Sequence, residues 1–179
     1  MMGRVEAVHR APTHEFSKQT ADRITLVPGL GVAGDAHQGA RVKHRSRVAV
    51  NPDQPNLRQV HLFELERLRT LADQGFPVSP GKVGENITTE GLDLTDLPLG
   101  TLLRFRSGAL IAITGLRNPC AQLDALAPGL MAACLDRSEG RVLRRAGVMA
   151  VVIGGGDVAA GDSFEPALPP APFRALDPV

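Results

Sequence analysis

Apolar and polar residues alternate along several short stretches of the chain, and such alternation predicts β-strands with one buried face. Residues 23–27 alternate clearly and residues 4–8 more loosely. Other short runs are almost continuously apolar, which is typical of strands buried on both faces. We therefore predict strands at residues 4–8, 23–27, 59–63, 84–89, 101–105, 109–113 and 148–153, with a last one after a turn at residues 161–162.

Two stretches have apolar residues at helical rather than strand spacing. Leucines recur in this way between residues 64 and 74 and predict an amphipathic helix, which ends at Gly75. A second helical pattern begins near Pro119, breaks at a Pro-Gly pair and resumes over residues 130–135. Cys134 lies in the apolar part of this second pattern, so we predict that it packs in the core.

The number and order of these elements predict the fold class. About seven to nine short strands with few helices and frequent glycine turns indicate a β-rich α+β protein, built as a closed, strongly bent β-barrel with peripheral helices. A doubly wound α/β sheet is the alternative, but strands alternate with helices only around residues 59–75 and 109–126. We expect a single domain over residues 1–165, followed by a proline-rich tail over residues 166–179.

Composition narrows the classes of partner. A formal net charge of +1 gives no overall field that would attract nucleic acid or a membrane surface. Aromatic residues make up only 3% of the chain and include neither Trp nor Tyr, so no platform exists for stacking exposed bases. Without a signal peptide or a long apolar run, we expect a soluble cytoplasmic protein whose two cysteines are free thiols.

The most reactive type of side chain in the sequence stands at a predicted turn. Asn118 and Pro119 follow a strand-like run and suit the N-cap and the first position of a helix. Cys120 would then lie in the first helical turn, where free N–H groups, the helix dipole and neighbouring Arg117 favour a thiolate. A thiolate here predicts a nucleophile or a soft-metal ligand. The alternative is a buried cysteine that packs as a small hydrophobe.

Two polar clusters are candidates for the same site. A glycine-rich loop carries Asp35 and His37, which can exchange protons near neutral pH; the alternative is a local Asx turn beside an exposed histidine. Glu85, Asn86 and Thr88 stand at the start of another predicted strand. These short polar groups predict either a pocket lining or merely a turn followed by an edge strand.

A basic patch follows the glycine-rich loop and consists of Arg41, Lys43, His44, Arg45 and Arg47. Such a patch is either a solvated surface or a mobile lid that binds the phosphate of a cofactor or an anionic substrate. Arg45 and Arg47 are its candidates for cofactor binding.

Three motifs stand in a characteristic order along the sequence: Gly34-Asp-Ala-His-Gln-Gly39, Gly84-Glu-Asn-Ile-Thr88 and Arg117-Asn-Pro-Cys120. In this order they resemble the MOSC domain family, named for the C-terminal domain of molybdenum-cofactor sulfurases. The resemblance extends from the first predicted strand to about residue 162. It implies the same strongly bent barrel, with a cleft that carries one reactive cysteine.

The resemblance implies, first, a molybdenum-binding reductase. In such relatives the thiolate, here Cys120, ligates molybdenum held by a pterin dithiolene, and a separate reductase supplies electrons. The substrates are N-hydroxylated bases, amidoximes and hydroxylamines. Contacts to the cofactor are expected from Arg117, Asn118, Glu85, Asn86, Thr88, Arg45 and Arg47. His37 or Asp35 would supply the proton that N–O cleavage requires.

The second implied class is a non-enzymatic carrier of sulfur or of the cofactor, with a persulfide on Cys120. The sequence has no cysteine-rich iron–sulfur motif and no nucleotide fingerprint, so it would be the acceptor half of a pathway. A zinc site from His37, His61 and Cys120 is a further alternative, although their spacing matches no zinc motif. A homodimer is compatible with either class.

Overall fold

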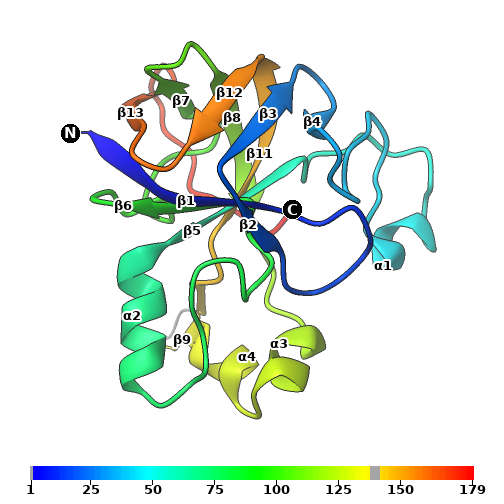
Figure 1. Cartoon of the computed structure of the whole chain (residues 1–179), viewed down its shortest axis with the longest axis vertical. Coiled ribbons are helices and arrows are strands. Elements are labelled where there is room, and N and C mark those ends of the chain that lie inside the picture. The colour runs from blue at the N-terminus through cyan, green and yellow to red at the C-terminus, as the bar shows by residue number, and fades with distance from the viewer. Residues whose placement is uncertain (1, 138–141) are drawn as a thin grey trace.

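The computed structural model describes residues 2–137 and 142–179 and shows a closed β-barrel with short helices at one end (Figure 1). The ring strands follow the order β13-β7-β8-β11-β5-β6-β1, and pairing of β1 with β13 closes the ring. These strands are β1 (Gly3–Arg10), β5 (Val60–Glu64), β6 (Ile87–Glu90), β7 (Leu102–Phe105), β8 (Leu110–Leu116), β11 (Val148–Gly154) and β13 (Ser163–Ala167). The predicted β-rich barrel is thereby confirmed.

The remaining strands are short and lie beside the ring. β2 (Gln19–Ala21) pairs with β1, while β3 (Arg23–Val27), β4 (Gly31–Val32) and β12 (Gly156–Ala159) form a small sheet of their own. β9 (Leu135–Asp136) pairs with β10 (Leu143–Arg144). Within the ring only β5 and β6 pair in parallel, so the alternative of a doubly wound parallel sheet is wrong for the described residues.

The helices are α1 (Arg45–Val48), α2 (Leu65–Asp73), α3 (Ala121–Leu126) and α4 (Leu130–Ala133). Figure 1 shows α2, α3 and α4 gathered below the barrel, with α1 to one side. The predicted leucine stripe of α2 is buried, at Leu65, Leu68 and Leu71. Among the described residues, none of the helices has the length and apolar character needed to cross a bilayer.

Two hydrophobic clusters fill the interior, and β5 contributes to both. Leu62 faces into the barrel, whereas its neighbour Phe63 packs with the helices, as alternation along a strand requires. The helical cluster includes Leu123, Leu130 and Cys134, and Cys134 is fully buried as predicted. A strand apolar on both faces thus ties the barrel to the helices.

The tail after β13 folds back against the barrel. The carbonyl of Asp177 accepts a hydrogen bond from Leu116 N at 2.9 Å, and Val179 N donates to Leu116 O at 3.2 Å. Leu176 is buried against the barrel core. The tail therefore supports the end of β8, which leads directly into the Arg117 to Cys120 turn.

The backbone at Gly147 holds this turn from the other side. Gly147 O accepts a hydrogen bond from Arg117 N at 3.0 Å, and Gly147 has φ +84°. A β-carbon added there would collide with the carbonyl oxygen of Leu62. Gly75 has a similar φ of +92°, but no atom lies within 4 Å of the place where its β-carbon would stand.

We predict that Gly147→Ala lowers the free energy of unfolding by about 3 kcal/mol or more, because it combines backbone strain with a clash in the core. Gly75→Ala should cost only about 1 kcal/mol, since it introduces backbone strain alone. Denaturant unfolding of the two variants beside the wild type measures both values. Equal losses would contradict the close packing of Gly147.

Candidate functional site

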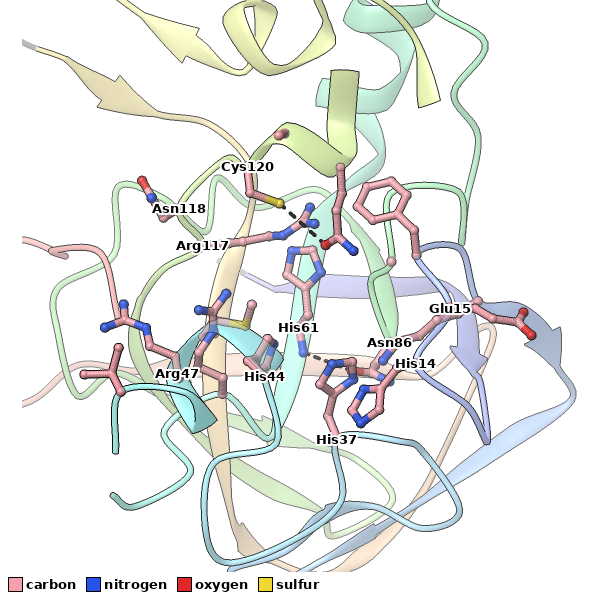
Figure 2. A pocket seen from close by; sticks show the side chains of 18 residues that line it. His14, Glu15, His37, His44, Arg47, His61, Asn86, Arg117, Asn118 and Cys120 are labelled. Carbon is pink, nitrogen blue, oxygen red and sulfur yellow. Dashed lines mark hydrogen bonds between the residues drawn. The ribbon is translucent and has the colours of Figure 1, made fainter. Parts of the chain in front are cut away.

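A cavity of about 640 Å³ opens where the β1–β2 connection, the loop before β5 and the Cys120 turn meet (Figure 2). His37, Asn86 and Cys120 all line it, so the predicted convergence of the three motifs on one cleft is confirmed. The lining also includes His14, Glu15, Phe16, Lys18, His44, Arg47, Val50, Arg58, His61, Gly84, Arg117, Asn118, Ala121, Gln122 and Met149.

Cys120 is half-buried and is itself the N-cap of α3. Its Sγ lies 3.6 Å from Gln122 Oε1. The prediction that Asn118 caps this helix is wrong, because the Asn118 side chain instead accepts a hydrogen bond from Arg144 Nε at 2.9 Å. The helix consequently begins after Cys120, and the thiol stands at the wall of the cavity.

Arg117 is only 7% exposed, although it carries a charge. Its guanidinium lies 5.5 Å from the centre of the Phe16 ring, as in a cation–π contact. Burial lowers the pKa of Arg117, and the nearby Cys120 partly offsets this. Nη1 has no hydrogen-bond partner in the described structure. A buried donor without a partner is costly, so this atom favours an acceptor in the cavity.

Two further cavity residues carry buried nitrogen atoms that lack a partner among the described residues. Nε of Arg58 and Nδ1 of His44 have no partner within the described part of the chain. Burial, reinforced by Arg117 and Arg47, lowers the pKa of Arg58 to about 10. Burial and then Arg58 lower the pKa of His44 below its ordinary range. The cavity therefore combines clustered cationic groups with unused donors, which is an arrangement suited to an anionic, oxygen-rich ligand.

Arg58 was not predicted from the sequence. The one available signal is that it lies two residues before a buried strand, a position where a charged side chain meets the end of the barrel. His44 was recognised only as part of the basic patch. Arg47 of that patch lines the cavity, whereas the exposed Arg41 pairs with Asp53. The side chain of Arg45 lies outside the described structure.

His37 reaches the cavity and is held from behind by Asp35. Asp35 Oδ2 accepts a hydrogen bond from His37 Nδ1 at 3.2 Å, and Lys18 Nζ lies 2.8 Å from Oδ1. Burial by itself raises the pKa of Asp35, but the bond from His37 and the charge of Lys18 lower it below the ordinary range. Asp35 does not line the cavity, so its position suits an ionised group that orients His37 better than a proton donor to substrate.

Of the three residues predicted to contact a cofactor near the start of β6, only one lines the cavity. Asn86 lines the cavity, and its Nδ2 donates to Asp35 Oδ1 at 3.2 Å. Glu85 and Thr88 are fully buried and bond to each other at 2.9 Å, outside the cavity lining. Direct cofactor contacts from Glu85 and Thr88 therefore do not fit this geometry.

The zinc alternative is also wrong for the described residues. No group of three His, Cys, Asp or Glu side chains among them could hold a metal ion. His61 Nε2 donates to Ala146 O at 2.9 Å, and burial lowers the pKa of His61 well below its ordinary value. His61 therefore has a structural hydrogen bond in place of a metal contact.

Comparisons with known proteins agree with the motifs. The MOSC domain family matches residues 33–165. A protein of Bacillus subtilis (strain 168) described as "Putative metal-sulfur cluster biosynthesis proteins YuaD" is 30% identical over 128 residues. That alignment covers 68% of this chain and 66% of the relative, slightly less than two thirds of its length.

Solved structures show the same architecture. The crystal structure of YuaD from Bacillus subtilis matches with a TM-score of 0.75 and 27% identity, over 93% of this chain and 96% of that one. YiiM from Escherichia coli matches with a TM-score of 0.65 over 97% of this chain and 73% of that one. At 22% identity, the likeness to YiiM concerns the fold alone.

The two cysteines are predicted to differ in reactivity. Burial raises the pKa of Cys134 and hides its sulfur, whereas Cys120 faces the cavity. Under native conditions a small alkylating reagent should modify Cys120 at least about tenfold faster than Cys134. Mass spectrometry of the digested protein measures both rates, with Cys120→Ser as the control that should remain unmodified until it unfolds. Faster labelling of Cys134 would contradict the assigned site.

Proposed function

This chain belongs to the MOSC domain family, and we propose that its cavity binds a molybdenum cofactor and reduces N-hydroxylated compounds. One observation carries the proposal: the half-buried thiol of Cys120 shares a cavity with unpaired guanidinium donors of Arg117 and Arg58. A soft sulfur ligand beside unused cationic donors matches a ligand that has both a soft metal and a phosphate.

The donor set fits the cofactor in kind and in size. The cavity volume of about 640 Å³ falls within the range of sites for small molecules and cofactors. Cys120 would ligate the metal through sulfur, while Arg117, Arg58 and Arg47 would neutralise the phosphate. Asn86 Nδ2 already donates to His9 O and Asp35 Oδ1, so only its Oδ1 would remain as an acceptor for the pterin edge. Bound in this way, the cofactor would supply the electrons for cleavage of an N–O bond.

The residues of this chain would manage the proton and the geometry. Reduction of a hydroxylamine consumes two electrons and two protons and yields an amine and water, because a leaving hydroxide must be protonated. His37 lies in the cavity with its ring fixed by Asp35, so it is the candidate donor to the leaving oxygen. A separate reductase would supply the electrons.

A second candidate function is transfer of sulfur or of the cofactor. The Bacillus subtilis relative is described as a putative metal-sulfur cluster biosynthesis protein, which favours a role in sulfur delivery. Cys120 would then hold a persulfide, and the cationic donors would stabilise its negative charge. The two functions differ in whether metal stays on the protein.

We predict that protein produced in a host that makes the cofactor contains about one molybdenum and one pterin per chain, both absent from Cys120→Ala. Cys134→Ala is the matched control, because it removes the other thiol from outside the cavity and should keep the metal. Elemental analysis and pterin fluorescence give both contents. If the protein stays metal-free but accepts persulfide sulfur at Cys120, the reductase proposal is wrong and the carrier function is supported.

We further predict that Arg58→Gln weakens retention of the cofactor about tenfold or more, since a charge-assisted hydrogen bond to phosphate is lost. Arg41→Gln is the control, because Arg41 is exposed and pairs with Asp53 outside the cavity lining. Molybdenum remaining after serial dilution and gel filtration measures retention. Equal retention in the two variants would remove Arg58 from the phosphate site.

A further inference from the structure

A second polar network lies within the barrel wall, behind the cavity. Its members extend from the exposed β2 to the residue before Asn86 and are Thr20, His9, Thr88 and Glu85. Thr20 Oγ1 lies 3.2 Å from His9 Nδ1, and His9 Nε2 lies 3.1 Å from Thr88 Oγ1. Thr88 Oγ1 then donates to Glu85 Oε1 at 2.9 Å. Three of the four side chains are fully buried, and only Thr20 meets solvent.

The hydrogen bonds of this network all point inward. Thr88 uses its single hydroxyl proton on Glu85, so it must accept from His9 Nε2. That assignment places the ring proton of His9 on Nε2, and Nδ1 therefore accepts from the hydroxyl of Thr20. Burial and then the charge of Lys18 lower the pKa of His9 to about 4, which keeps the resting ring neutral. A neutral ring with one donor and one acceptor is what proton transfer through it requires.

The inner end of the network lies beside the cavity. Gly84 and Asn86, on either side of Glu85, line it. Glu85 Oε1 accepts from Gly81 N at 2.6 Å as well as from Thr88, whereas Oε2 has no partner in the described structure. Arg117 Nη1 is likewise buried and unpaired, and the two groups act on each other electrostatically.

The carboxyl of Glu85 is suited to hold a proton. Burial raises its pKa, and this outweighs the hydrogen bonds and the charge of Arg117, which lower it. The other cation that acts on it is Lys18, which is itself paired with Asp35. Since Oε1 accepts two hydrogen bonds, a proton held by Glu85 would rest on Oε2, the oxygen without a partner.

We propose that this network is a proton relay, which carries protons from the surface at Thr20 to the floor of the cavity beside Arg117. A water molecule between Glu85 Oε2 and Arg117 Nη1 would complete the path. The relay explains why a buried carboxyl, a neutral imidazole and two hydroxyls form one continuous hydrogen-bonded chain through the barrel wall. An entirely structural network would not need a carboxyl group whose outer oxygen is unpaired.

The relay rests on the proposed function, because reduction of an N–O bond consumes protons inside a closed cavity. For a hydroxylamine, R–NHOH, two electrons from the reductase and two protons give R–NH₂ and water. Glu85 releases the proton on Oε2 to the bridging oxygen, and Thr88 returns its hydroxyl proton to the carboxylate. His9 then reprotonates Thr88 from Nε2, and Thr20 reprotonates His9 on Nδ1 before recovering a proton from solvent. Reorientation of the carboxyl group, the imidazole and the hydroxyls returns the protons to Oε2 and Nε2 before the second transfer.

Deuterium exchange at Glu85 tests the relay without any cofactor. The infrared carbonyl band of the neutral carboxyl is identified as the band missing from Glu85→Gln, and its shift after transfer of the full chain into D₂O is followed in time. Thr88→Val should slow this shift about tenfold or more, because it removes one relay hydroxyl with little change in shape. Thr88→Ser should restore the wild-type rate.

Thr89→Val is the matched control. Thr89 is the next residue of β6, equally buried, and its hydroxyl has no hydrogen-bond partner in the described structure. Its exchange rate should equal that of the wild type. Should Thr88→Val fail to fold, Thr20→Val interrupts the relay at the exposed end and should also slow exchange. Absence of a neutral Glu85 band, or equal rates in Thr88→Val and Thr89→Val, would overturn the proposal.

Turnover of the cofactor-loaded protein then tests the use of the relay. With excess reductant, Thr88→Val should lose about tenfold in rate at unchanged molybdenum content, increasingly so at higher pH where direct protonation by solvent is slower. Thr89→Val should keep the full rate. Slowed exchange with unchanged turnover would overturn the role in reduction. If wild-type protein holds no molybdenum, the proposed function fails while the exchange experiment still decides the relay.

Discussion

The burial of one guanidinium group, that of Arg117, constrains the rest of the site. A buried cation without a hydrogen-bonded anion costs several kcal/mol. Within residues 2–137 and 142–179, this cost is offset by the Phe16 ring and by the fields of Glu85 and Cys120. None of these partners bonds to Nη1. An anionic ligand that bonds to Arg117 Nη1 would therefore recover part of the free-energy cost of burying this charge, and this gain would contribute to its binding affinity.

Such a group stays in place only if the backbone around it is fixed. Arg117 N donates a hydrogen bond to Gly147 O, just before β11. The backbone N–H and C=O of the preceding residue, Leu116, both form hydrogen bonds with the C-terminal tail. The β-carbon that Gly147 lacks would stand against the wall of β5, so this approach is as close as two backbones allow. These hydrogen bonds fix the backbone at the start of the turn. Cys120 lies three residues after Arg117, so the same bonds help to position its thiol.

The sequence predicted what depends on local pattern. Alternation identified most of the ring strands, and the order of three short motifs identified the cavity. It failed where a side chain has a distant partner: Asn118 gives up its capping role to Arg144, and Arg58 acquires its role only through the convergence of distant loops. Alternation also tells which residues of a strand share a face. It cannot tell whether that face lines a cavity or is buried in the protein interior. The sequence therefore predicts cofactor contacts from both Asn86 and Thr88, whereas only Asn86 lines the cavity.

Two buried carboxyl groups next to Asn86 differ in the charge that their surroundings favour: Asp35 is bonded to the Asn86 side chain, and Glu85 precedes Asn86 in the chain. Asp35 has Lys18 at 2.8 Å and two donors from His37, so burial is overcome and the group remains ionised. Glu85 receives only neutral donors at bonding distance, and its cations act from farther away, so burial prevails and its pKa rises. When the surroundings of two neighbouring acids shift their pKa values in opposite directions, the ionised one can orient another side chain while the other one transfers protons. The hydrogen bond from His37 and the charge of Lys18, which both contact Asp35 and not Glu85, create this asymmetry.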